Sequence, residues 1–80
     1  MTERLDPQLL AKRERLVERF TALQLDLGGA YYEMAIRDHI RPDVLLRKAA
    51  ELQRVDAELR QVDEALRQRE AAAATAAPAA

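Results

Sequence analysis

The residues capable of acid–base chemistry gather around a single histidine. His39 lies among Arg37, Asp38 and Arg41, and the segment YYE at residues 31–33 precedes it by about two helical turns. An imidazole beside carboxylates can serve general acid–base catalysis when a nucleophile or a second acid is correctly placed. The chain has no serine and no cysteine to act as that nucleophile. We therefore expect His39 to be structural or solvated near a helix carboxyl end, where the macrodipole favours it, and we expect no enzymatic activity.

Metal and cofactor chemistry has no recognisable motif either. One histidine and no cysteine exclude a multi-histidine or thiolate metal cage. Gly28-Gly29 lacks the preceding strand and the following Lys-Ser/Thr of a phosphate-binding loop. We predict no catalytic residue, no cofactor and no metal. The alternative function is a subunit or ligand-binding bundle with a small pocket near four residues: Tyr31, Tyr32, Glu33 and His39.

The charge balance argues against nucleic acid and membrane partners. The 80 residues carry 13 Lys and Arg against 14 Asp and Glu, for a net charge of −1. One basic cluster near the N-terminus is interrupted by two glutamates, and consists of Lys12, Arg13, Arg15 and Arg19. Such balance lacks the electrostatic footprint of either partner. No apolar run is long enough for a signal peptide or a membrane span, so we expect a cytoplasmic protein.

The elements that position these residues are two helices, which two heptad patterns in the sequence predict. Asp6 and Pro7 form a helix start, because the carboxylate can cap free N–H groups and proline at the first position loses no bond. Apolar residues then recur at alternating spacings of three and four, which is typical of a helical seam. The first seam consists of Leu9, Leu16, Phe20, Leu23, Leu27, Ala30 and Met34, and the second of Leu45, Leu52, Val55, Leu59, Val62 and Leu66. Arg13 is the polar exception in the first seam.

The end of the first helix is set by a proline. A residue before proline avoids the α region, so Arg41 should end the helix or lie in the turn. We predict an all-α, antiparallel two-helix coiled-coil hairpin within residues 6–70. It consists of a helix over about 7–40, a turn at about 39–43 and a second helix over about 43–70. With the turn centred on residue 41, facing residues should sum to about 82, which places Leu27 beside Val55.

The two ends of the chain and its outer faces complete this expectation. Residues 1–5 should be a flexible N-terminus, and the alanine-rich residues 71–80 a disordered Ala/Pro tail. On the outer faces, opposite charges lie four residues apart, as is typical of solvated helices. The pairs are Glu33–Arg37, Arg47–Glu51, Asp56–Arg60 and Asp63–Arg67.

A second apolar stripe lies on the side of the first helix away from its seam. A two-helix monomer would leave such a stripe exposed, and an exposed contiguous apolar patch marks an association site. We therefore expect a non-catalytic structural or protein-interaction module that acts by helix–helix packing. Its partners would be itself, as a homodimeric four-helix bundle, and a second helical protein. The expected interaction surface comprises Leu25, Gly28, Gly29, Tyr32, Ile36, Ile40 and Leu46.

Gly28 and Gly29 sit in the middle of this stripe. Two glycines inside a helix cost roughly 2 kcal/mol relative to alanine, so they should have a reason to be there. One interpretation is a kink or break in the helix. The other, which we favour because the heptad phase is unchanged across the glycines, is close helix approach, with Ala49 and Ala50 facing the chain about one turn further on. A neutral role is the third interpretation.

One segment is similar to a known group of proteins. The segment LGGAYYEMAIRDHIRPDVLLRKAAELQRVDAEL, at residues 27–59, resembles a small, uncharacterised family of bacterial helical-hairpin proteins. Members of that family often carry a C-terminal zinc ribbon of paired Cys-x-x-Cys knuckles after an Ala/Gly/Pro-rich linker. This chain ends in AAAATAAPAA and has no cysteine, so the resemblance transfers no zinc site. It implies a hairpin module without an activity that can be carried over.

Overall fold

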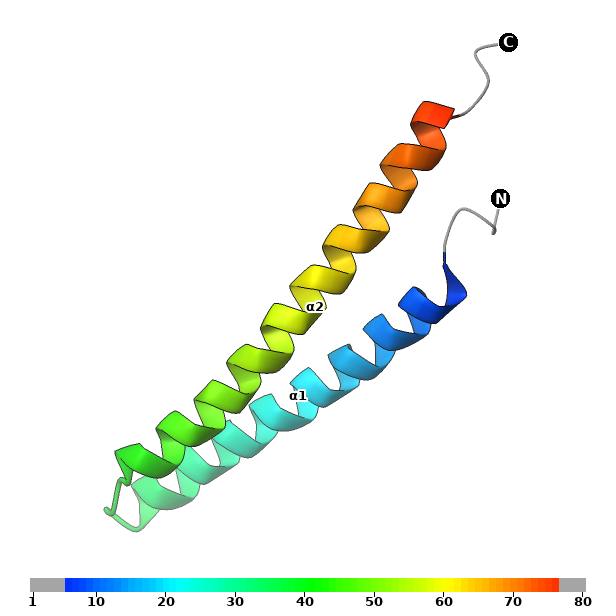
Figure 1. Cartoon of the computed structure of the whole chain (residues 1–80). Helices are drawn as coiled ribbons and strands as arrows, with labels where there is room; N and C mark the ends of the chain where they lie inside the picture. The colour runs from blue at the N-terminus through cyan, green and yellow to red at the C-terminus, as the bar shows by residue number, and fades with distance from the viewer. Residues whose placement is uncertain (1–5, 77–80) are drawn as a thin grey trace.

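The computed structural model describes residues 6–76 as two long helices joined by a short turn. α1 spans Pro7–Ile36 and α2 spans Pro42–Ala76. The two helices run antiparallel and side by side, with the turn at one end and the start of α1 and the end of α2 at the other (Figure 1). Principal extents of 67 × 16 × 15 Å leave room for only a single layer of two helices. No strand occurs within the described residues, and the predicted all-α helical hairpin is confirmed.

α1 begins where the sequence predicts, at the Asp6-Pro7 pair. The carboxylate of Asp6 accepts a hydrogen bond from the backbone N–H of Gln8 at 2.8 Å, which satisfies one of the free donors of the first turn. A second oxygen of the same carboxylate lies 3.0 Å from Arg69 of α2. Asp6 therefore caps α1 and also ties its start to the other helix.

α1 ends at Ile36, four residues earlier than the predicted boundary of about 40. Asp38 adopts a left-handed backbone conformation with φ of 53°. The N–H of Asp38 donates to the carbonyl of Ala35 at 3.1 Å, and that of His39 to the carbonyl of Met34 at 2.9 Å. This double closure is a Schellman motif, which satisfies the last carbonyls of a helix and reverses the chain direction. The backbone conformation of Asp38 therefore ends the helix at Ile36, before the steric effect of Pro42 on Arg41 can act.

α2 starts at Pro42 and continues through much of the predicted tail. The backbone N–H groups of Val44 and Leu45 donate to the carbonyl of Arg41 at 3.2 and 3.3 Å and open the helix. The expectation of a disordered tail from residue 71 is wrong for residues 71–76, which are helical. Alanine is the strongest helix former, so the run extends α2 without needing a packing partner. The rest of that tail and the predicted flexible residues 1–5 lie outside the described residues.

Buried residues of both predicted seams form the core. Leu16, Val55, Val62 and Leu66 are buried, and all four come from the predicted seams. Partly buried side chains pack around them, and these are Leu9, Phe20, Leu23 and Leu59. The core lies toward the open end of the hairpin, because the seam residues nearest the turn are only half-buried.

The register differs from the expected one. The helix bounds centre the turn on residue 39 instead of 41. The ion pairs that cross the hairpin join residues whose numbers sum to between 70 and 76 instead of about 82: Asp6–Arg69, Arg13–Asp63, Arg19–Glu51 and Asp26–Lys48. A shift by whole helical turns keeps the same apolar residues in the seam, which is why the seam is correct although the register is not.

Ion pairs across the hairpin explain the polar exception in the seam. Arg13 pairs with Asp63 at 2.5 Å, so its charge is neutralised at the edge of the contact. Two further pairs cross between the helices at 3.3 and 2.6 Å: Arg19–Glu51 and Asp26–Lys48. Of the pairs predicted within one helix, Glu33–Arg37 and Asp56–Arg60 form. In the other two, the acids pair across the hairpin instead, Glu51 with Arg19 and Asp63 with Arg13.

Candidate interaction surface

The side of α1 away from α2 carries large apolar side chains in contact with solvent. Leu25, Tyr32 and Ile36 retain 72%, 63% and 59% of their accessible surface. Residues of a helix that are seven or eleven apart share a face, so these three form one stripe. Together with five exposed small or uncharged neighbours they make up what we call the outer face of α1: Thr21, Ala22, Leu25, Gly28, Gly29, Tyr32, Ala35 and Ile36.

The outer face of α1 has no charged side chain over its whole length. The two carboxylates within this span, Asp26 and Glu33, lie at its edges. Asp26 pairs with Lys48 of α2 at 2.6 Å, and Glu33 with Arg37 at 2.8 Å. Both carboxylates are therefore neutralised by partners away from the face, which leaves a strip that is suited to contact with another apolar surface.

The glycines lie at the middle of the outer face and in an unbroken helix. α1 runs continuously through Gly28 and Gly29, so the interpretation as a break is wrong. A Cβ atom built on either glycine meets nothing within 4 Å outside its local backbone. Close approach of α2 is therefore not the reason for them either. If these glycines permit close packing, the other helix must come from outside this chain.

The other predicted surface residues lie on different elements. Ile40 is exposed in the turn, and Leu46 is exposed on α2 with 69% of its surface accessible. The seven residues predicted as one surface thus come from α1, the turn and α2. Three more exposed large apolar residues were not part of the predicted interaction surface: Leu10, Val17 and Tyr31. Their spacing of seven residues, through Gln24, is the heptad signal that could have identified them.

The four residues of the alternative ligand pocket all lie on the surface, and none of them lines either of the two pockets described below. Tyr31, Tyr32 and His39 are exposed, and Glu33 is held in its pair with Arg37. Within residues 6–76, no group of three or more His, Cys, Asp or Glu side chains is arranged to hold a metal ion. These positions offer no enclosed, desolvated environment in which acid–base chemistry could be tuned.

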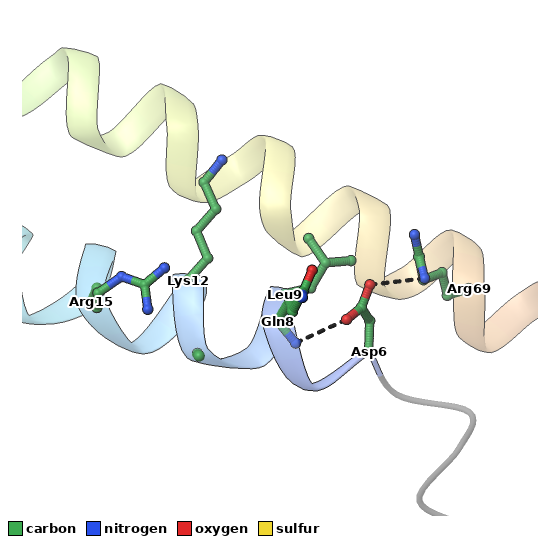
Figure 2. Close-up of a pocket in the computed structure, with 7 residues that line it drawn as sticks. Asp6, Gln8, Leu9, Lys12, Arg15 and Arg69 are labelled. Carbon is green, nitrogen blue, oxygen red and sulfur yellow. Dashed lines mark hydrogen bonds and ion pairs between the residues drawn. The ribbon is translucent and has the colours of Figure 1, made fainter.

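A shallow pocket of about 440 Å³ lies at the open end of the hairpin (Figure 2). Lys12 extends from α1 across toward α2, and Arg15 follows one turn later. The carboxylate of Asp6 lies between the backbone N–H of Gln8 and the guanidinium of Arg69. A smaller pocket of about 210 Å³ on α2 is lined by Val44, Arg47, Lys48 and Glu51. Both are open to solvent and rimmed by charged side chains, so neither resembles the concave, largely apolar site of a small-molecule ligand.

Charged side chains on α2 follow the same pattern of local pairing. The guanidinium of Arg67 donates to Glu64 at 2.7 Å, and this hydrogen bond, with the charge of Glu64, raises the pKa of Arg67 above its ordinary value. Arg67 therefore stays a cation on a solvated face.

Comparisons with known proteins leave the function to be argued from this geometry. No family model, curated protein or solved structure matches the chain. In the part of the chain that the structure describes, neither helix combines the length and apolar character required to cross a membrane.

Proposed function

We propose that the protein is a non-catalytic interaction module that packs the outer face of α1 against another helical surface. Its first partner is a second copy of itself, and a different helical protein with an apolar face is the other partner that this surface fits. The observation that carries the proposal is the outer face itself, with eight exposed positions and no charge. Solvated helix faces ordinarily carry charges three or four residues apart.

The small core of the hairpin supports association as well. Four side chains in the described residues are buried, and none of them is fully inaccessible. Chains of this size bury too little surface for more than marginal stability, and disulfides or association are the usual remedies. With no cysteine in the chain, association is the remedy that its sequence permits. Two associated hairpins would form an assembly of four helices.

The proposal is tested by placing a carboxylate on the outer face. Wild-type protein at micromolar concentration should sediment as a dimer or a larger species. Tyr32→Asp or Ile36→Asp would bury an unpartnered charge in an apolar contact, which is strongly unfavourable, so both variants should sediment as monomers. Their helicity should fall at the same concentration, since an isolated helix pair is marginal. Analytical ultracentrifugation and circular dichroism measure the two effects.

Gln61→Asp on α2 is the matched control, because it adds the same carboxylate to an exposed position outside the outer face. It should leave mass and helicity unchanged. If the face serves a different protein, the Tyr32→Asp and Ile36→Asp variants should keep their mass and helicity but lose that partner in affinity capture. Retention of mass, helicity and captured proteins in both variants would make the face ordinary surface and overturn the proposal.

A further inference from the structure

The outer face of α1 is complementary to itself when a second copy is turned end to end. Its midpoint falls between Gly28 and Gly29, and residues equally far from this midpoint have numbers that sum to 57. Leu25 and Tyr32 form one such pair, and Ala22 and Ala35 form another. We propose that two copies of the chain pack their α1 helices antiparallel through this face, around a two-fold axis that passes between Gly28 and Gly29. This inference rests on the proposed function and specifies its geometry.

The pairing matches apolar with apolar residues on both sides of the glycines. Leu25 lies opposite the partner's Tyr32, and both side chains are exposed in the hairpin. At the centre, Gly28 lies opposite the partner's Gly29, where the absence of side chains lets the two backbones approach. Because nothing in the hairpin comes within 4 Å of a Cβ atom at either position, the partner helix supplies the reason for two helix-weakening residues.

The flanks of the face continue the match. Thr21, at the start of the face, falls level with the partner's Ile36 at its end, and both side chains are exposed. A face made for an unrelated protein has no reason to repeat its uncharged character about its own midpoint. Symmetric self-contact requires that repetition, because each patch meets its own copy.

The direction of the outer face determines the shape of the dimer. Successive residues of an α-helix are about 100° apart, which places the seam with α2 on the opposite side of α1 from the midpoint of the outer face. The burial pattern agrees, since the seam residues are buried or half-buried and the outer face is exposed. Each α1 therefore lies between its own α2 and the partner's α1. The dimer is a flat row of four helices with the two α2 helices at its edges, instead of a square four-helix bundle.

The contact is short, and its affinity should be modest. From Thr21 to Ile36 the face spans 16 residues, or about 24 Å of helix. Two helices that touch over this length form an interface at the small end of specific ones. We expect a dissociation constant in the micromolar range, so that the chain is dimeric at concentrations well above it and dissociates on dilution.

Disulfide cross-linking of full-length chains tests the axis directly, because the natural sequence has no cysteine. An equimolar mixture of Leu25→Cys and Tyr32→Cys chains should form a covalent dimer under mild oxidation. Each variant alone should not, because identical residues would be offset by seven positions, about 10.5 Å along the axis. That offset exceeds the separation a disulfide can span. Leu46→Cys chains, alone or mixed with either variant, are the control and should stay uncoupled.

A second measurement separates the flat row from the square bundle. Leu46→Asp places a carboxylate on α2 at a position about as exposed as Leu25. In the flat row Leu46 is outside the contact, so this variant should sediment as a dimer while Leu25→Asp dissociates. Covalent dimers from Leu25→Cys alone, or dissociation of the dimer by Leu46→Asp, would overturn the proposed geometry. The proposed function would still stand in that case, provided that the wild type is dimeric. A wild type that stays monomeric at the highest concentration would end the self-association proposal altogether.

Discussion

At the scale of single residues, Asp38 has the largest effect on the shape of the hairpin. It occupies the left-handed position of the Schellman motif, which glycine fills most often because it has no Cβ atom to clash. Its carboxylate also lies at the carboxyl end of α1, where the helix dipole disfavours negative charge. The chain thus turns at a residue that is suboptimal for the turn on two counts. Sequence reasoning located the turn by Pro42 because Asp38 carries no glycine-like signal.

Asp38→Gly should therefore stabilise the hairpin. Relief of the left-handed strain is worth about 1–2 kcal/mol, and the greater backbone freedom of glycine in the unfolded chain offsets part of it. We expect a net gain of about 1 kcal/mol, which raises the melting temperature by about 4–8 °C for a domain of this size. Thermal denaturation by circular dichroism measures it.

Asp38→Ala is the informative comparison, because it removes the charge but keeps the Cβ atom. It should be less stable than Asp38→Gly, because the left-handed strain remains. Equal stabilisation by glycine and alanine would show that the charge at the helix end, and not the backbone conformation, limits the stability of the turn.

At the scale of the helices, the seam is buried unevenly along its length. Leu16 is buried beside Val55, Val62 and Leu66, whereas Leu27, nearer the turn, is only half-buried. The spacing of three and four residues identifies both leucines as seam positions but carries no information on depth. Depth depends on how closely the helices approach at each level, which is a property of the pair.

Leu16→Ala and Leu27→Ala measure this gradient with the same chemical change on the same helix. Leu16→Ala should lower the free energy of unfolding by about 3–4 kcal/mol, since it leaves a cavity in the best-buried layer. Leu27→Ala should cost about 1–2 kcal/mol, because its site is already partly open to solvent. Urea denaturation at one fixed protein concentration gives both values. Equal losses at the two sites would contradict the uneven core.

The end of α2 extends past the start of α1 and should contribute little to stability. Asp6, at the start of α1, pairs with Arg69, so the last turn of α2 lies beyond the described part of α1. Deletion of residues 72–80 should leave the melting temperature unchanged within about 1 °C, while helicity falls only by the residues removed.

A deletion that begins at Leu66 is the contrasting variant, since it removes a buried side chain together with Arg69, the partner of Asp6. It should lower the melting temperature by several degrees or prevent folding. A comparable loss from the shorter deletion would mean that the alanine segment docks on a surface, most simply that of a second copy.

At the scale of the whole molecule, the sequence predicts the architecture correctly but not the helix boundaries, the register or all the ion-pair partners. The heptad spacing of apolar residues predicts two helices and also the faces through which they pack, because the same period determines the helix and its apolar face. Leu16 and Leu23 follow this spacing in α1, and Leu59 and Leu66 in α2. The predicted helix boundaries and register were wrong because they depend on the backbone conformation of single residues, such as Asp38. The ion-pair partner of a charged residue was wrong where a residue of the other helix replaces the partner predicted within the same helix, as Arg13 does for Asp63. The exposed stripe was predicted, but its separation into a continuous face on α1 and an isolated Leu46 on α2 needed the structure.

The placement of both open helix ends at one pole of the hairpin also determines how the molecule responds to mechanical load. A force that pulls the start of α1 from the end of α2 acts across the seam, so the helices part layer by layer from that pole toward the turn (Figure 1). The first layers to resist are the best buried, around Leu16, Val62 and Leu66. Once these have separated, only half-buried layers remain, and they yield at lower force. Extension of the chain by its ends should therefore release the whole hairpin in one abrupt event, with the highest resistance at the very start.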